Sequence, residues 1–175
     1  MSQEIQIKGL KELDDLMKQL PAKIYNRVLK GGMRAGQKVL ADAAKGYLQA
    51  NGSVDSGELL KSIRIRFNRK SERFGYARAY VMAGNKEAYY AHMIEYGTGS
   101  YYAGNGTKSV KGPYEIRPKG EGSLLVAGIN RNLVTHPGIK PKPFMRPAVD
   151  NYADDAITAV FNYLQKRIPK EVLKL

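Results

Sequence analysis

The stretch SIRIRFNRKSERFGYARAYVMA, residues 62–83, decides the fold class of this chain. Its first half alternates apolar and polar residues, with Ile63, Ile65 and Phe67 on one face, which is the period of a half-buried strand. After a short polar turn, apolar positions return in residues 75–83. Two such runs joined by a turn predict a β-hairpin.

Helical patterns flank this hairpin on both sides. Residues 10–20 repeat leucine and methionine at helical spacing, and Pro21 suits the first turn of a second helix. A shorter helix is predicted over residues 88–96 and a long final helix over residues 145–167. The apolar stripe of the second helix reads Ile24, Val28, Ala35, Val39, Ala43 and Tyr47, and that of the final helix reads Ala148, Tyr152, Ala156, Val160 and Leu164.

Three glycines, Gly31, Gly32 and Gly36, interrupt the stripe of the second helix. Each costs a helix about 1 kcal/mol relative to alanine, so three in one helix need a physical reason. The glycines could mark a kink or close packing against a neighbour, or they could belong to a phosphate-binding loop. No Gly-Lys-Ser/Thr ending follows them, so we favour the kink or close packing.

The order of helices, strands, a helix, strands and a helix predicts an α+β fold. We expect a mostly antiparallel sheet, with long N-terminal and C-terminal helices packed on one side. The length suits one domain, residues 1–175, with a long inserted loop at about residues 98–142. Within this loop, residues 114–117 and 123–127 read as two short strands around a turn at residues 119–122.

Composition limits the classes of partner. The chain carries 29 Lys and Arg against 16 Asp and Glu, a net charge of +13. This excess favours an anionic partner such as nucleic acid, a membrane surface or an acidic protein ring. No apolar run reaches the roughly 18 residues of a membrane span, so we expect no membrane partner. The absence of cysteine excludes disulfides, thiolate zinc sites and cysteine nucleophiles.

A catalytic arrangement is hard to find in the sequence. His92 and Glu95 lie one turn apart on a predicted helix, but a metal site would need a third ligand such as His136. No Gly-x-Ser-x-Gly elbow occurs. We therefore predict that the chain is not an enzyme, that it has no catalytic residue, metal or cofactor, and that His92 packs or forms a hydrogen bond.

Basic and aromatic residues support an alternative, a nucleic-acid-binding protein. The arginines Arg64, Arg66 and Arg69 crowd the hairpin, and Tyr80 nearby could stack on a base. Alternating arginines on a strand are equally typical of a solvated face. No sequence-reading motif occurs, so contact with nucleic acid would depend on shape and charge and not on base sequence.

Four motifs follow one another along the chain: IKGLKEL at residues 7–13, DSGELLKSI at 55–63, YAHMIEYGT at 90–98, and HPG at 136–138 followed by PFMRPA at 143–148. Together they resemble the tail-completion or minor tail family of long-tailed bacteriophages, which includes the Z-type protein of phage lambda. The resemblance covers nearly the whole chain. The segment between Thr98 and His136 is longer than in the shorter members of that family.

The resemblance implies a structural virion protein of the neck, at the head–tail junction or the top of the tail, without catalysis. It further implies self-association into a ring, of six copies, and contact with other neck and tail proteins such as the tail tube, terminator and connector. Such a protein is made in the cytoplasm of the host bacterium and resides in the virion. Non-specific contact with genomic DNA is an open alternative.

The motif residues read as positions that define the fold. A glycine follows Tyr96 in the C-terminal capping position, and Pro143, Phe144 and Pro147 set the entry to the last helix. The motif residues with a predicted structural role are Gly57, Leu59, Ser62, Tyr90, His92, Glu95, Gly97, Thr98, Pro143, Phe144 and Pro147. The candidate interface residues are Arg64, Arg66, Arg69, Tyr101, Tyr102, Lys108 and Lys111.

Overall fold

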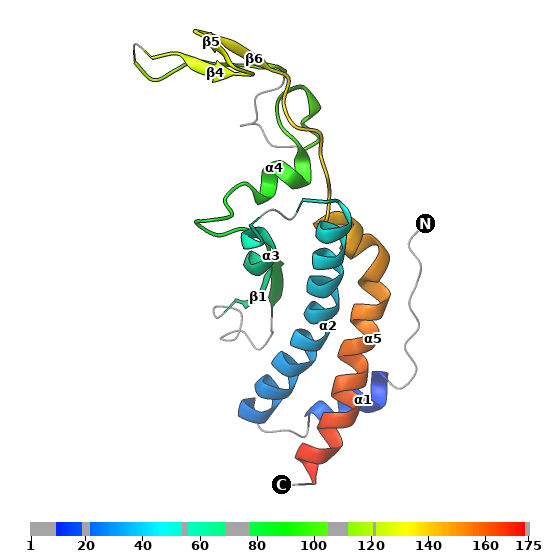
Figure 1. Cartoon of the computed structure of the whole chain (residues 1–175). Helices are drawn as coiled ribbons and strands as arrows, with labels where there is room; N and C mark the ends of the chain where they lie inside the picture. The colour runs from blue at the N-terminus through cyan, green and yellow to red at the C-terminus, as the bar shows by residue number, and fades with distance from the viewer. Residues whose placement is uncertain are drawn as a thin grey trace.

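Two long antiparallel helices form the body of the protein. The computed structural model describes residues 10–18, 22–53, 56–68, 78–104, 112–120 and 122–173. Helix α2 (Ala22–Ala50) runs along α5 (Met145–Val172), and the short helix α1 (Leu10–Lys18) packs against the C-terminal half of α5 (Figure 1). Both long helices lie where the apolar periodicity predicts them.

A β-hairpin covers another side of α2. Strand β1 (Arg64–Phe67) pairs antiparallel with β2 (Ala79–Met82), with Ile65 opposite Val81. Helix α3 (Glu58–Ser62) precedes the hairpin. Ile65 is half-buried and faces the core while Arg64 is exposed, as the alternation predicts. The turn predicted between the two strands lies outside the described residues.

The segment between α4 (Ala91–Tyr96) and α5 contains a projecting arm, which we define as residues 112–136 (Figure 1). A 3-10 turn, η2 (Gly99–Tyr101), precedes the arm. The predicted strands at 114–117 and 123–127 exist, but they pair with two other strands. The four strands are β3 (Tyr114–Ile116), β4 (Leu124–Val126), β5 (Ile129–Arg131) and β6 (Val134–His136).

The strand pairing confirms the α+β fold and shows how the sheet is divided. Strand β3 pairs with β6, and β4 pairs with β5 across the turn at Ala127–Gly128; both pairs are antiparallel. The described strands thus form three separate two-stranded sheets and not one continuous sheet.

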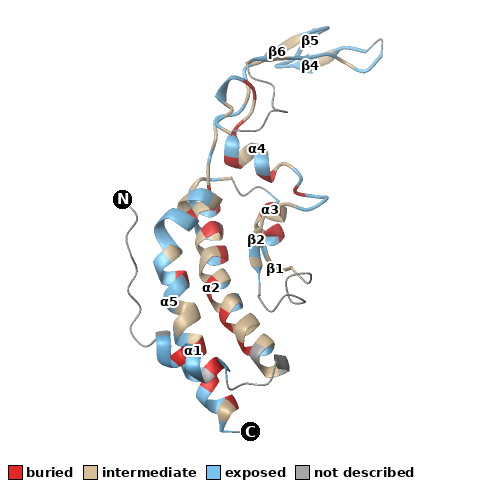
Figure 2. Cartoon of the chain, turned by 180° about the vertical axis from the view of Figure 1, so that it is seen from behind, coloured by how far each residue is buried: buried red, intermediate tan, exposed pale blue. Residues whose placement is uncertain are grey.

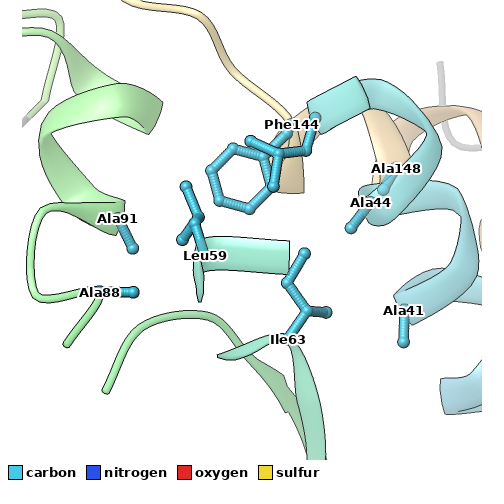
Figure 3. Packing of buried hydrophobic residues seen from close by; sticks show 9 residues of the cluster. Ala41, Ala44, Leu59, Ile63, Ala88, Ala91, Phe144 and Ala148 are labelled. Carbon is cyan, nitrogen blue, oxygen red and sulfur yellow. The ribbon is translucent and has the colours of Figure 1, made fainter. Parts of the chain in front are cut away.

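The hydrophobic core consists of two clusters along the helix pair, whose residues are among the buried positions drawn in red in Figure 2. One cluster joins the C-terminal half of α2 to α3, α4 and the start of α5, around Phe144 (Figure 3). The other joins α1 to the N-terminal half of α2 and the end of α5, around Val28 and Ile168. None of the described residues of the arm is buried (Figure 2).

The glycines of α2 form part of its buried face. A Cβ atom added to Gly36 would lie 2.8 Å from the backbone oxygen of Ala156, and one added to Gly32 would lie 3.0 Å from Leu164 Cδ2. Close packing against α5 is therefore the reason for these glycines. The predicted apolar stripe of α2 is wrong from Ala35 onward, because Ala35, Val39, Ala43 and Tyr47 are only half-buried. The buried positions of the helix are Val28, Gly32, Gly36, Ala41, Ala44 and Leu48.

We expect the substitution Gly36→Ala to destabilise the protein by about 1–2 kcal/mol. Alanine gains about 1 kcal/mol of helix propensity, but overpacking costs about 1–3 kcal/mol, and here the clash is with a backbone oxygen that cannot rotate away. Gly46 is the matched control, since it lies in the same helix with no atom within 4 Å of an added Cβ. Gly46→Ala should stabilise by up to about 1 kcal/mol. Urea denaturation measures both effects. Equal stabilisation by the two substitutions would show that α2 and α5 are not closely packed at Gly36.

Candidate assembly site: the helix cap and the arm

Glu95 of α4 caps the N-terminus of α5. Its carboxylate oxygens accept the backbone N–H groups of Phe144 at 2.8 Å, Met145 at 2.9 Å and Arg146 at 3.1 Å. The guanidinium of Arg146 donates to the same carboxylate at 3.2 Å and stacks over the ring of Tyr96. Since Glu95 is only 5% exposed, one buried carboxylate joins two helices about 50 residues apart in sequence.

The environment of Glu95 favours its ionised form. Burial alone would raise the pKa of this carboxyl, but the N–H groups of Met145, Phe144 and Arg146 and the Arg146 side chain bind the carboxylate. Their combined effect lowers the pKa of Glu95 below its ordinary value of 4.5. The positive end of the α5 dipole acts in the same direction. A negative charge is thus fixed at the point where α5 begins.

The sequence at the start of α5 explains why its first N–H groups need an acceptor from another part of the chain. Phe144 occupies the N-cap position and forms no side-chain cap, because its ring is apolar and lies in the core at 1% exposure. Pro147 lies in the first turn of α5, where its missing N–H costs nothing. The carbonyl of Pro143 accepts a hydrogen bond from Asn51 Nδ2 at 2.9 Å, which ties the entry of α5 to the end of α2.

Gly97 and Thr98 hold the base of the arm. Gly97 has a φ of 74°, and an added Cβ would lie 2.7 Å from the oxygen of Ile139. The backbone N–H of Thr98 donates to the Ile139 oxygen at 2.9 Å, and the Ile139 N–H donates back to Thr98 Oγ1 at 2.9 Å. The Ser100 N–H donates to the Pro137 oxygen at 2.8 Å. The chain leaving the body and the chain returning to it therefore lie side by side.

The remaining motif residues support the core around Phe144. Leu59 and Ser62 are each 2% exposed. Ser62 Oγ donates to the Leu59 oxygen at 2.7 Å and accepts the Gly84 N–H at 2.8 Å, which fixes the start of the hairpin. Gly57 precedes α3 with a φ of 78°, a conformation that favours glycine. The ring of Tyr90 packs against the same core.

His92 and Glu95 have separate partners. His92 Nδ1 lies 2.9 Å from the Tyr89 oxygen, while Glu95 is engaged by α5. Among the described residues, no three His, Asp or Glu side chains are grouped so that they could hold a metal ion. Within the same residues, no helix has the length and apolar character to cross a membrane.

The predicted interface residues lie in two separate places. Arg66 is exposed on β1, whereas the guanidinium of Arg64 donates to the oxygens of Ser62 at 3.0 Å and Gly84 at 2.9 Å. Tyr101 is 40% exposed near the base of the arm, and Tyr102 lies against Tyr96 there. Arg69, Lys108 and Lys111 lie outside the described residues. Their role as interface residues stays a prediction.

The arm exposes several large apolar side chains. Leu125 is 72% exposed, Ile129 56%, Leu133 42% and Val126 40%. The strand pairs within the arm and the hydrogen bonds at its base hold the arm. An isolated two-stranded hairpin is marginally stable in water, so this surface favours a further partner.

Sequence reasoning missed the cap that Glu95 provides and the apolar surface of the arm. One signal for the cap was available: the final helix begins at Met145 without a preceding Ser, Thr, Asp or Asn, so its N–H groups needed acceptors from elsewhere. The apolar positions 124–126 were also visible, as part of a predicted strand. Their exposure was not, because strand periodicity does not say whether a partner covers the strand.

These features define an α+β structural protein, with a capped helical body and a projecting arm. Residues 8–97 match the family model HK97-gp10_like, described as "Bacteriophage HK97-gp10, putative tail-component". The match covers half of the chain, and the chain belongs to this family of bacteriophage tail components. The arm and α5 follow the matched segment. No curated protein and no solved structure matches the chain.

Proposed function

We propose that this tail component is a tail-completion protein of the lambda Z-type. In this proposal it self-associates into a ring, of six copies, at the head–tail junction or the top of the tail. Its neighbours are other neck and tail proteins, such as the tail tube, terminator and connector. The family membership supports the structural role in the virion, and the four sequence motifs support the tail-completion type.

The observation that carries self-association is the exposed apolar surface of the arm. Side chains such as Leu125 and Ile129 are more than half exposed, at the end of a segment that buries no described residue of its own. Exposed apolar surfaces of this kind are typical of protein–protein interaction sites. A ring protein needs such a surface because each copy must contact the next one.

A second candidate function is sequence-independent nucleic-acid binding. On α2, the basic residues Arg27, Lys30, Arg34 and Lys38 recur at spacings of three and four residues, which aligns them along one side of the helix. Arg27, Arg34 and Lys38 are exposed. A basic stripe of this kind suits phosphate contacts, and such contacts weaken steeply with salt.

Light scattering of the purified protein at low and high salt, with and without duplex DNA, separates the two candidates. A ring gives a species of about six times the 19.5 kDa mass of one chain, independent of DNA. An apolar subunit contact should also persist at high salt. A monomer that gains mass only with DNA and only at low salt would contradict the ring and support nucleic-acid binding.

A variant without the arm serves as the matched comparison. Tyr114 and His136 are direct partners across β3 and β6, so a two-residue Asn-Gly turn can replace residues 115–135 and join them. We expect this variant to keep its helical circular dichroism and its urea midpoint, because the arm contributes no described buried residue. Its mass should be that of a single chain. Rings that form without the arm would show that self-association depends on another surface.

A further inference from the structure

The body carries an apolar groove between its two long helices. Met33, Gln37 and Leu40 line one wall from α2, and Ala153, Ile157 and Phe161 line the other from α5. The groove has a volume of about 470 Å³, and Ile157 at its edge is 38% exposed. It exists because small residues, such as Gly36 and Ala156, form the closest approach of the two helices and leave space beside it.

The groove and the arm lie apart on one molecule, since the groove is midway along the body, at residues 33–40 of α2 and 153–164 of α5. Figures 1 and 2 show the β4–β5 hairpin beyond α4, past the start of α5, whereas the groove residues of α5 begin two turns further down the helix. The hairpin therefore does not reach the groove of its own chain. Two different patches on one chain that fit each other give a head-to-tail contact, which closes into a ring when the rotation allows it.

The outer hairpin of the arm presents an apolar face. Val126 and Ile129 are partners across β4 and β5 and share this face, and both side chains are exposed. A groove lined mainly by aliphatic and aromatic side chains is the surface that such a hairpin can bury.

On its α5 side, the groove is complementary in charge to the arm. Asp150 and Asp154 are exposed on α5, seven residues before the groove residues Ile157 and Phe161 and therefore on the same side of the helix. The arm presents the exposed basic residues Lys119 and Arg131, while its Glu115 is bound by Arg117 at 2.9 Å. A basic hairpin that enters the groove would meet an acidic rim, which favours the correct orientation.

We infer that the β4–β5 hairpin of one copy binds in the α2–α5 groove of the next copy. The inference rests on the proposed self-association and names the two surfaces that make the contact. Val126 and Ile129, which are partners across the hairpin and share one face, fill the groove beside Ile157 and Phe161, and Lys119 and Arg131 lie near Asp150 and Asp154. Each copy then uses its arm once and its groove once.

Cysteine cross-linking tests this contact directly, because the chain has no cysteine of its own. The double variant Ile129→Cys/Ile157→Cys is treated with a short bifunctional maleimide and examined on a denaturing gel. We expect a ladder of covalent multimers, because each copy links to two others. Each single variant can form covalent dimers at most. The control is Ile129→Cys/Asn162→Cys, since Asn162 is exposed on α5 and does not line the groove.

Light scattering of the same samples separates the two ways of failing. Multimers that give no ladder, or the same ladder with the control, would overturn the arm-to-groove contact and leave the ring intact. A protein that stays monomeric at every concentration would overturn both proposals. A supporting result is that Val126→Asp and Ile157→Asp each weaken self-association by about tenfold or more, the effect of losing one buried large apolar side chain. Unchanged self-association in both variants would overturn the arm-to-groove contact.

Discussion

Replacing Glu95 with glutamine is expected to lower the free energy of unfolding by about 3 kcal/mol. The reason is that hydrogen bonds to a charged acceptor contribute about 1.5–3 kcal/mol each, and glutamine removes the charge that these donors share. Three backbone N–H groups and the Arg146 side chain share this carboxylate. Glutamine keeps the shape but places an NH₂ group among donors.

The measurement is urea denaturation at pH 7, with Glu58→Gln as the matched control. Glu58 forms an ion pair with Lys61 at 2.9 Å on the exposed side of α3, and its loss should cost less than about 1 kcal/mol. Equal losses in the two variants would show that the cap on α5 contributes no more than a surface ion pair.

The effect of Glu95→Gln should also depend on pH. Because the folded-state pKa of Glu95 is lowered, the unfolded state takes up a proton first as the pH falls. The stabilisation by the carboxylate is therefore complete above the ordinary pKa of 4.5 and is lost as the pH falls through the lower folded-state pKa. The difference between wild type and variant should be largest near neutral pH and shrink below pH 4.5.

Replacing Phe144 with alanine should destabilise the protein by about 3–5 kcal/mol, the usual cost of removing a fully buried aromatic ring. Phe144 is 1% exposed and lies among Leu59, Ala44 and Ala148, with α3 on one side and the two long helices on the other (Figure 3). Alanines surround much of this ring, and they cannot reach into the space it leaves. The cavity should therefore collapse little, which places the cost in the upper part of the range.

The urea midpoint and thermal unfolding measure this effect. Tyr89→Ala is the control, since it removes an aromatic ring that is 67% exposed and should change stability by no more than about 0.5 kcal/mol. Phe144→Leu should lie between the two, because leucine refills part of the cavity. A loss below about 1 kcal/mol for Phe144→Ala would mean that α5 is held mainly by its packing on α2.

The sequence predicted those parts of the molecule that follow from local patterns. Alternation in residues 62–67 predicted β1, and helical periodicity predicted α2 and α5, because burial on one side imposes a period that neighbouring residues record. The glycines of α2 required a choice between a kink and close packing, and α5 supplies the packing. The glycines themselves can be read from the sequence. The surface of α5 that requires residues without a Cβ atom cannot.

The sequence by itself therefore determined the α+β class, the two long helices, the hairpin and the motifs of a phage tail component. Only the tertiary structure decided that Glu95 caps α5, that β3 pairs with β6, and that the arm stands away from the body. The physical reason is distance along the chain. A period of two or 3.6 residues can be read from neighbouring residues. The contact between Glu95 and Met145 joins residues 50 positions apart, so no local period identifies Glu95 as the partner of Met145.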